Sequence, residues 1–313
     1  MRKGSSAPAR RGRISSTIIV GLALAAAGAG AEELLPARFG VTGPLALPGE
    51  PAARAMPRGQ GGAPVAAAVP EDAGGPGLTA EFGPLGLPCG ASLSAEAAPG
   101  GTARLRLEAP CQPGAAVTIS HGALSVTFRA SSSGVIDTVL PAFEDAARYS
   151  ARLPDGELLT ASALVPGASA YERVVTMWEG AGGLSVHAFE YGAGRGEAGH
   201  VWRGAPRGAQ AAEAGRGGFL LALGTAEGAG ARRAEVYSFP AAVAARAGAV
   251  RIALAAAVTP ATCGGEIEAE TLQLGEGLPG APVAVRVTLP DCAAAAGDLM
   301  LKNLARDLKI AAQ

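Results

Sequence analysis

The segment RLRLE at residues 104–108 alternates charged and apolar side chains, which is the two-residue period of a strand with one buried face. Similar short runs follow it, and turn residues separate them. At Pro154-Asp155-Gly156 the turn has a physical cause, because proline presets φ and glycine accepts a positive φ. The pattern predicts a β-sandwich at residues 81–166. The predicted strands are residues 104–108, 117–119, 124–128, 135–140, 149–153 and 158–160.

A second series of strand patterns begins after Pro166-Gly167 and continues to the end of the chain. The patterns at 171–178 and 184–191 flank a glycine-rich segment, which predicts a hairpin. Further strands are predicted at residues 219–223, 234–239, 249–258, 267–274 and 282–289. The sequence therefore predicts an all-β fold, with a second β-sandwich-like domain at residues 167–313. Within the first domain, the segment from Pro110-Cys111 through Ser133-Gly134 to Ala142 resembles immunoglobulin-like and transthyretin-like modules.

The tail after Asp298 fits two structures. Leu301, Leu304 and Leu308 have the spacing of a helix that Asp298 would cap. Residues 299–301 and 308–310 also fit two short strands. Because every pattern before the tail is a strand pattern, the two strands are favoured.

The first 31 residues have the pattern of an export signal. Five basic residues between Arg2 and Arg13 precede an apolar run at residues 14–31, which ends in Ala29-Gly30-Ala31, the pattern after which signal peptidase cleaves. The run also reaches the lower limit of a membrane-spanning helix, roughly 17 to 25 residues. Cleavage is favoured and anchoring stays open. We expect a periplasmic protein, either released or anchored to the inner membrane by residues 14–31.

Residues 32–80 are rich in proline, glycine and alanine and show no sustained period of a strand or a helix. Such a segment cannot bury enough apolar surface to offset the entropy lost on ordering. The sequence therefore predicts a disordered linker, which would act as a tether if the N-terminal run is retained.

The charge of the chain excludes some classes of partner. Without the five basic residues of the N-terminal segment, 21 Lys+Arg stand against 27 Asp+Glu, a formal charge of −6. Binding to nucleic acid needs clustered cations that neutralise phosphates, so we expect no nucleic-acid partner. We expect membrane attachment only through the N-terminal segment, if it is uncleaved.

The four cysteines lie two in each predicted domain. An even number of cysteines in an exported chain predicts disulfides, and pairing within each domain lets each domain close alone. We therefore predict the pairs Cys89 with Cys111 and Cys263 with Cys292. A zinc site is disfavoured because no C-x-x-C spacing occurs.

The stretch FEYGAGRGEAGHVW at residues 189–202 is the candidate binding or structural loop. Its glycines allow the chain to leave a sheet in a tight bend, and Trp202 is expected to hold the loop by burying its indole. The candidate residues are Glu190, Gly192, Gly194, Gly199, His200 and Trp202.

His187, Glu190 and His200 offer a second interpretation of this stretch, as metal ligands. Residues three apart on a regular strand face opposite sides, which separates His187 from Glu190. We therefore expect no metal and no other cofactor. Trp178 and Trp202 fit either a sugar-binding platform or core packing, and the low aromatic content, 4% of residues, favours the core.

The same stretch also carries a resemblance to a known family. The other matching segments are Cys111, residues 235–240, Cys263-Gly264, residues 289–292 and the tail at residues 301–311. Together they resemble an uncharacterised family of alphaproteobacterial envelope proteins whose members are often labelled translocase. The resemblance covers roughly residues 80–313. It implies a role linked to translocation and supplies no catalytic residues.

Motifs of common enzymes are missing from the sequence. It has no G-x-x-x-x-G-K-[ST] loop, and Gly192 to Gly196 lacks the third glycine of a dinucleotide-binding loop. Residues 131–134 (SSSG) are not a nucleophile elbow, His121 is expected to end a hairpin, and Glu144-Asp145 is expected on a solvated loop.

We therefore expect a non-enzymatic envelope protein that acts through binding or assembly, with an unknown envelope protein or cell-wall component as its partner. Two alternatives stay open. One is an accessory component of protein export, which the family label implies. The other is a periplasmic hydrolase or a metal-binding protein.

Overall fold

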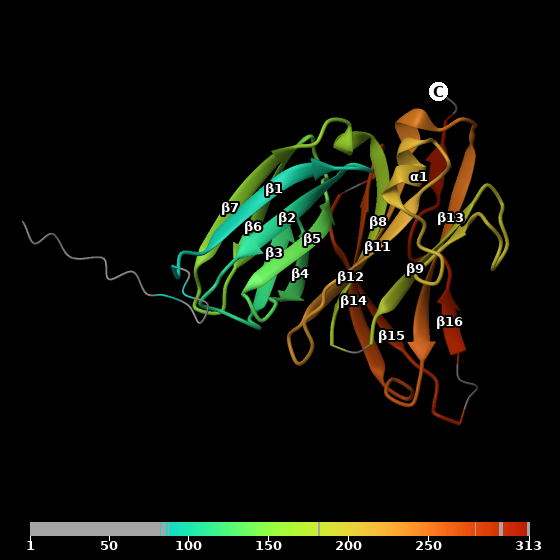
Figure 1. Cartoon of the computed structure of the whole chain (residues 1–313). Helices are drawn as coiled ribbons and strands as arrows, with labels where there is room; N and C mark the ends of the chain where they lie inside the picture. Colours follow the sequence, from blue (N-terminus) through green and yellow to red (C-terminus); the bar gives the residue numbers. More distant parts are fainter. Residues whose placement is uncertain are drawn as a thin grey trace, which may run out of the picture. The chain divides into compact units, whose positions relative to one another are not determined.

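The computed structural model describes residues 82, 86, 88–180, 182–278, 280–293 and 297–311. The predicted signal or anchor at residues 1–31 and all of the predicted linker at residues 32–80 lie outside them. The described residues belong to one compact unit, Asp72–Gln313. This part of the chain is all-β, as predicted (Figure 1).

The first seven strands form two antiparallel sheets, in the orders β1-β2-β5 and β4-β3-β6-β7. On β2 the apolar Leu105 and Leu107 point into the core, while Arg104 and Arg106 are exposed, as the alternation of RLRLE predicts. The predicted turn at Pro154-Asp155-Gly156 joins β6 to β7. The bounds are β1 (Ser92–Ala98), β2 (Thr102–Glu108), β3 (Ala116–His121), β4 (Leu124–Arg129), β5 (Val135–Pro141), β6 (Ala146–Arg152) and β7 (Leu158–Leu164).

The later strands form two further antiparallel sheets. One has the order β11-β12-β8-β14-β15; the other has the order β10-β9-β13-β16, and β17 also pairs with β13. The two tail strands favoured from the sequence are present as β16 and β17. The bounds are β8 (Tyr171–Glu179), β9 (Leu184–Glu190), β10 (His200–Val201), α1 (Ala209–Glu213), β11 (Phe219–Leu223), β12 (Arg232–Pro240), β13 (Gly248–Val258), β14 (Glu266–Leu274), β15 (Val283–Thr288), β16 (Gly297–Leu301) and β17 (Leu308–Ile310), with 3-10 turns at Ala168–Ala170 and Ala241–Val243.

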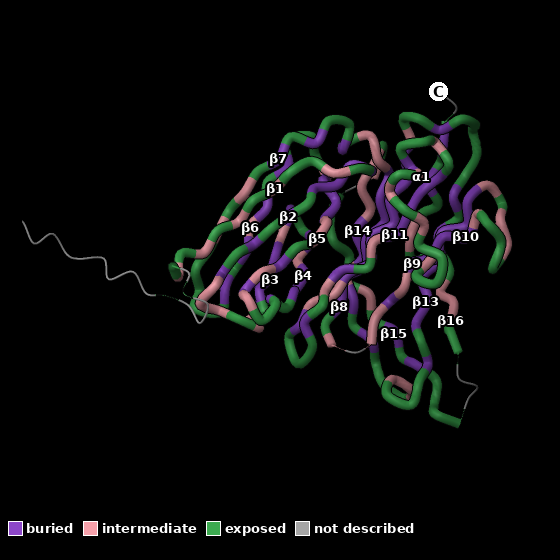
Figure 2. The backbone as a smooth tube through the Cα atoms, viewed as in Figure 1, coloured by how far each residue is buried: buried purple, intermediate pink, exposed green. Residues whose placement is uncertain are grey.

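Strands β8, β12 and β14 contribute residues to both hydrophobic cores, whereas β15 of the same sheet is mostly exposed. Val175 and Met177 of β8 belong to the hydrophobic core of the first seven strands. Val174 and Trp178, on the opposite face, belong to the core shared with β9 and β13. Figure 2 shows buried residues along β8, β11 and β14. β8 and β12 are buried along most of their length although each contains polar residues. Their buried Arg173, Thr176 and Glu235 form hydrogen bonds within the protein.

The predicted hairpin between residues 171–178 and 184–191 is wrong. β8 pairs with β12 and β14, so both of its edges are occupied, and β9 pairs with β10 and β13 in the other sheet. The connection therefore crosses between sheets. The Thr176 hydroxyl donates to Leu184 O at 2.7 Å across this crossing, and Gly183 packs against the Trp178 indole where a larger residue would overlap the ring.

Both predicted disulfides are confirmed. Cys89 bonds to Cys111 and Cys263 bonds to Cys292, across sequence separations of 22 and 29 residues. In the chain-entropy description, loops of this length stabilise the fold by about 3 to 4 kcal/mol each. Among the described residues, no helix is long and apolar enough to cross a bilayer.

Candidate functional site

The predicted loop leaves its sheet after Glu190 and returns as β10 at His200. Tyr191 and Gly192 have positive φ values of 53° and 83°, and the Ala193 amide donates to Glu190 O at 3.0 Å. Two successive residues with positive φ form the tight turn that glycine-rich sequences permit. The loop returns the chain beside β9, where β10 pairs His200 with Phe189 and Val201 with Ala188. Paired residues share a face of the sheet, and successive residues on each strand alternate between its two faces.

On the outer face of this sheet, four aromatic side chains form a stack: His187, Phe189, His200 and Trp202. The Phe189 and His200 rings are nearly parallel, with centroids 4.5 Å apart and an interplanar angle of 2°. Trp202 is half-buried, so it covers the stack without reaching the core. This differs from the predicted buried indole; Trp178, by contrast, lies in the core as predicted.

One N–H group links the two histidines of the stack by a hydrogen bond. The Gly196 amide donates to His200 Nδ1 at 3.0 Å, which places the His200 proton on Nε2. That Nε2–H donates to His187 Nδ1 at 2.9 Å. Burial lowers the pKa of both rings, that of His187 to about 4, with His200 as a second cause.

Because this proton lies between them, the two facing nitrogens cannot both donate an electron pair to a metal ion. The structure brings His187 and His200 together but directs the Glu190 carboxylate elsewhere, so the three residues considered as ligands are not assembled. No group of three or more His, Cys, Asp or Glu side chains within the described residues could hold a metal ion.

The Glu190 carboxylate lies on the inner face, in a buried polar network. Its Oε1 accepts hydrogen bonds from the Gly218 amide at 2.7 Å, the Tyr237 hydroxyl at 2.8 Å and Arg207 Nη1 at 2.9 Å. Burial and the adjacent Glu190 both raise the pKa of Tyr237, which keeps its hydroxyl a donor. The network thus satisfies a carboxylate that is only 4% exposed.

Arg207 connects this network to the loop. Its Nη1 also donates to Gly218 O at 2.9 Å, and its Nη2 donates to Ala198 O at 2.8 Å. Gly217 passes so close to the pair that a methyl group there would overlap both Glu190 and Arg207. The ion pair and the glycine therefore fix the loop against the segment that follows α1.

Above this ion pair the loop encloses a cleft of about 820 Å³, together with α1 and the segment before β13. Of the predicted loop residues, Glu190, Gly192 and Gly199 line the cleft, whereas Gly194, His200 and Trp202 are not part of its lining. Three arginines also line it: Arg207, Arg216 and Arg246.

The sequence analysis did not identify the three arginines or Tyr237 as site residues. They lie in separate segments, and no motif or regular spacing in the sequence relates them to one another. One signal could have found the network. Glu190 follows Val186 and Ala188 at the two-residue period of the core-facing side of β9, and a charge at such a position requires a buried partner.

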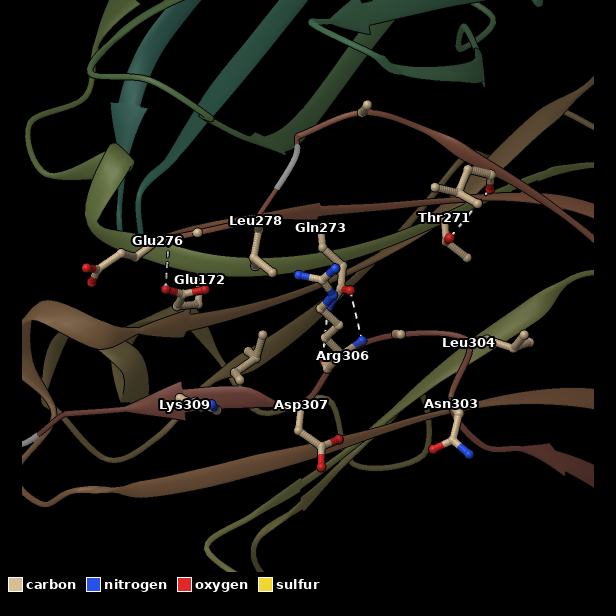
Figure 3. Close-up of a pocket in the computed structure, with 15 residues that line it drawn as sticks. Glu172, Thr271, Gln273, Glu276, Leu278, Asn303, Leu304, Arg306, Asp307 and Lys309 are labelled. Carbon is tan, nitrogen blue, oxygen red and sulfur yellow. Dashed lines mark hydrogen bonds between the residues drawn. The ribbon is translucent and has the colours of Figure 1, made fainter.

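A second groove, of about 1020 Å³, lies between β14 and β15 on one side and the chain tail on the other (Figure 3). The Gln273 side chain holds the tail with two hydrogen bonds of 2.9 Å, to the amide and the carbonyl of Arg306. Burial raises the pKa of Glu172, which accepts a hydrogen bond from the Glu276 amide at 3.1 Å. The lining mixes acids with Arg306 and Lys309, so the groove favours neither sign of ligand charge.

The remaining polar candidates have structural partners. His121 ends β3, as predicted; its Nδ1 bonds Arg148 O and its Nε2 accepts from the Phe143 amide, both at 2.8 Å. Asp145 accepts hydrogen bonds from the Ser169 amide and hydroxyl and from the Gly167 amide, which lowers the pKa of its carboxyl. The Ser131 hydroxyl accepts from the Val135 amide.

No protein-family model matches the chain, and no curated protein matches it either.

Proposed function

We propose that this is an exported protein of the bacterial envelope that acts by binding a partner, without catalysis, through the cleft between the β9–β10 loop and α1. Two disulfides in an all-β unit support an oxidising compartment, since such bonds persist outside the cytoplasm. The basic and apolar N-terminal residues, which have the pattern of an export signal, also support export.

The observation that carries the proposal is that hydrogen bonds within the protein occupy five of the six histidine ring nitrogens and the carboxylate of Glu190. The Nδ1 atoms of His121, His187 and His200 each take part in a structural hydrogen bond, and so does Nε2 of His121 and His200. Glu190 is likewise saturated by donors. A general base needs a free electron pair facing its substrate. The cleft instead offers the exposed arginines Arg216 and Arg246, which suit recognition of a partner.

Export is tested with a reporter that is active only outside the cytoplasm, fused after Gln313. We expect an active reporter, because the charge before the apolar run keeps the N-terminus inside and sends the remainder out. An expressed but silent fusion would contradict export.

Binding through the cleft is tested with a photo-crosslinking residue at Ala245, on the rim of the cleft, in intact cells. The matched control is the exposed Glu157 in the turn between β6 and β7. We expect a defined crosslinked product from position 245 that position 157 does not give. The partner's identity then separates a cell-wall component from a component of protein export. Equal products at both positions would refute recognition by the cleft.

A further inference from the structure

We propose that the cleft binds an oxyanion of its ligand through the guanidinium groups of Arg216 and Arg246. The inference rests on the proposed binding function and adds the chemical class of the ligand. It begins with the charges that line the cleft, which are Arg207, Arg216, Arg246, Glu190 and Glu197.

Two of these charges cancel inside the protein. Glu190 and Arg207 form a close ion pair, Nη1 to Oε2 at 2.8 Å, with only 4% and 21% of the respective side chains exposed. Glu197 is exposed, and one of its oxygens accepts a hydrogen bond from the Gly194 amide at 2.8 Å. Arg216 and Arg246 form no ion pair with any residue that the structure describes. The cleft therefore keeps an excess of positive charge.

The concave shape of the cleft strengthens the attraction of this positive charge for anions. A hollow of about 820 Å³ with protein walls focuses the electrostatic potential of the groups at its rim, so exposed cations attract anions more strongly there than on a convex surface. Gly192 and Gly215 contribute no side chains to the lining, and a Cβ at Gly192 would meet open space. The room beside the arginines is thus open to a ligand.

Arg246 is held in place before any ligand arrives. Its guanidinium lies 4.1 Å from the centroid of the Tyr191 ring, and the Tyr191 hydroxyl donates to Arg246 O at 3.4 Å. Stacking on an aromatic face leaves the N–H groups along the guanidinium edge free to bind a planar oxyanion with two parallel hydrogen bonds. Tyr191 itself is fixed by the tight turn after β9 and packs against Gly248.

Arg216 follows α1 and is positioned through its backbone. Its amide donates to Ala211 O at 2.9 Å, and the neighbouring Gly215 adopts a positive φ of 66°. This turn directs the chain back toward the ion pair at Gly217. Arg216 and Arg246 therefore belong to two hydrogen-bonded segments that line one cleft.

The test uses titration calorimetry on the full exported chain with three probes: inorganic phosphate, an acetylated dipeptide with a free C-terminal carboxylate, and the same dipeptide as its amide. We expect one of the two anionic probes to bind, with an affinity that falls as ionic strength rises. Binding of phosphate would identify a phosphate group as the oxyanion, and binding of the free dipeptide would identify a carboxylate. The dipeptide amide should not bind.

Arg216→Gln and Arg246→Gln should each weaken binding about tenfold, and Arg152→Gln on the exposed face of β6 should leave it unchanged. Thermal unfolding confirms that each variant folds. Failure of both anionic probes, or unchanged binding in the double variant, would overturn the oxyanion site. A crosslinked partner at the cleft would then still support the proposed function, which the reporter and crosslinking experiments test separately.

Discussion

Glu190 lies beneath a cleft that is open to solvent, yet its carboxylate takes its hydrogen bonds from protein groups. Arg207, Tyr237 and Gly218 supply the donors. A buried charge without such partners would be strongly destabilising, since the hydration it loses is not replaced. The three segments that carry these donors are therefore constrained by one side chain, and this constraint shapes the base of the cleft.

Replacing Glu190 by glutamine should lower the free energy of unfolding by about 2 to 4 kcal/mol, because the largely buried Arg207 loses its counter-charge. Urea unfolding at neutral pH measures the change. Glu197→Gln is the control, since this exposed residue keeps an acceptor for the Gly194 amide and should change stability by less than about 0.5 kcal/mol. Equal effects of the two substitutions would contradict the role of the ion pair.

The three histidines predict a dependence of stability on pH. All three are buried, and burial lowers the pKa of each ring. Unfolded histidine titrates near pH 6.5, whereas folded His187 titrates at about 4. Between these values the unfolded chain binds more protons than the folded protein. The free energy of unfolding should therefore fall as pH falls through this window.

Several neighbouring charges act on the stacked pair. Arg195 lowers the pKa of both rings, Arg251 lowers that of His200, and Asp298 opposes the shift at His187. The raised pKa of Glu172 has the opposite effect, because it increases the free energy of unfolding as pH falls. Glu172 therefore opposes the histidines near the acid end of the window. Urea unfolding at pH 7.5, above the histidine window, and at pH 5, inside it, tests the expected loss. His121→Gln, which keeps a donor and an acceptor, should make the loss smaller, and equal stability at both pH values would refute this account.

At the level of strands, alternation predicted most of the fold. Runs such as 104–108 and 149–153 alternate clearly, because one face meets the core and the other meets solvent. The sequence analysis missed β1, since Ser92–Ala98 is made of small and polar residues whose pattern is weak. It also missed β10 and α1, which are only 2 and 5 residues long. Short elements are defined by their tertiary neighbours, and these leave little trace in local sequence.

The crossing from β8 to β9 could not be predicted, because the residues that stabilise it are distant in the sequence. Glu235 of β12 is fully buried, and its Oε2 accepts a hydrogen bond from the Val186 amide of β9 at 2.8 Å. Its Oε1 accepts from Arg203 Nε at 2.6 Å. β10 pairs with β9 only at Ala188 and Phe189, so Glu235 supplies the acceptor that a neighbouring strand would otherwise provide.

Replacing Glu235 by alanine should therefore lower the free energy of unfolding by about 2 to 4 kcal/mol and speed hydrogen exchange of the Val186 amide. Glu235→Gln keeps an acceptor for that amide and should change stability by about 1 kcal/mol. Arg203 is 54% exposed, so its charge returns to water in both variants. Unchanged exchange at Val186 in the alanine variant would exclude this function of Glu235.

Across the whole described chain, Arg173 connects the first seven strands to the later ones. It lies on β8, is 1% exposed, and donates to Gly101 O and Ala168 O at 2.8 Å. Burial lowers its pKa to about 10. The backbone adds further links, since the Thr225 and Ala226 amides donate to Thr127 O on β4. The predicted division into domains at residues 81–166 and 167–313 stays a prediction, and it can be tested by the cooperativity of unfolding.

We expect a single unfolding transition, because β8 contributes to both hydrophobic cores and cannot leave one intact while the other unfolds. Both tryptophans lie in residues 167–313, so fluorescence follows only the later strands, whereas far-UV circular dichroism follows all of them. The midpoints in urea should coincide for the two signals. Arg173→Met, which leaves two carbonyl groups without their donor, should lower both midpoints together. Separate midpoints in the unmodified protein would instead show that the two parts unfold independently, and Arg173→Met would then move them by different amounts.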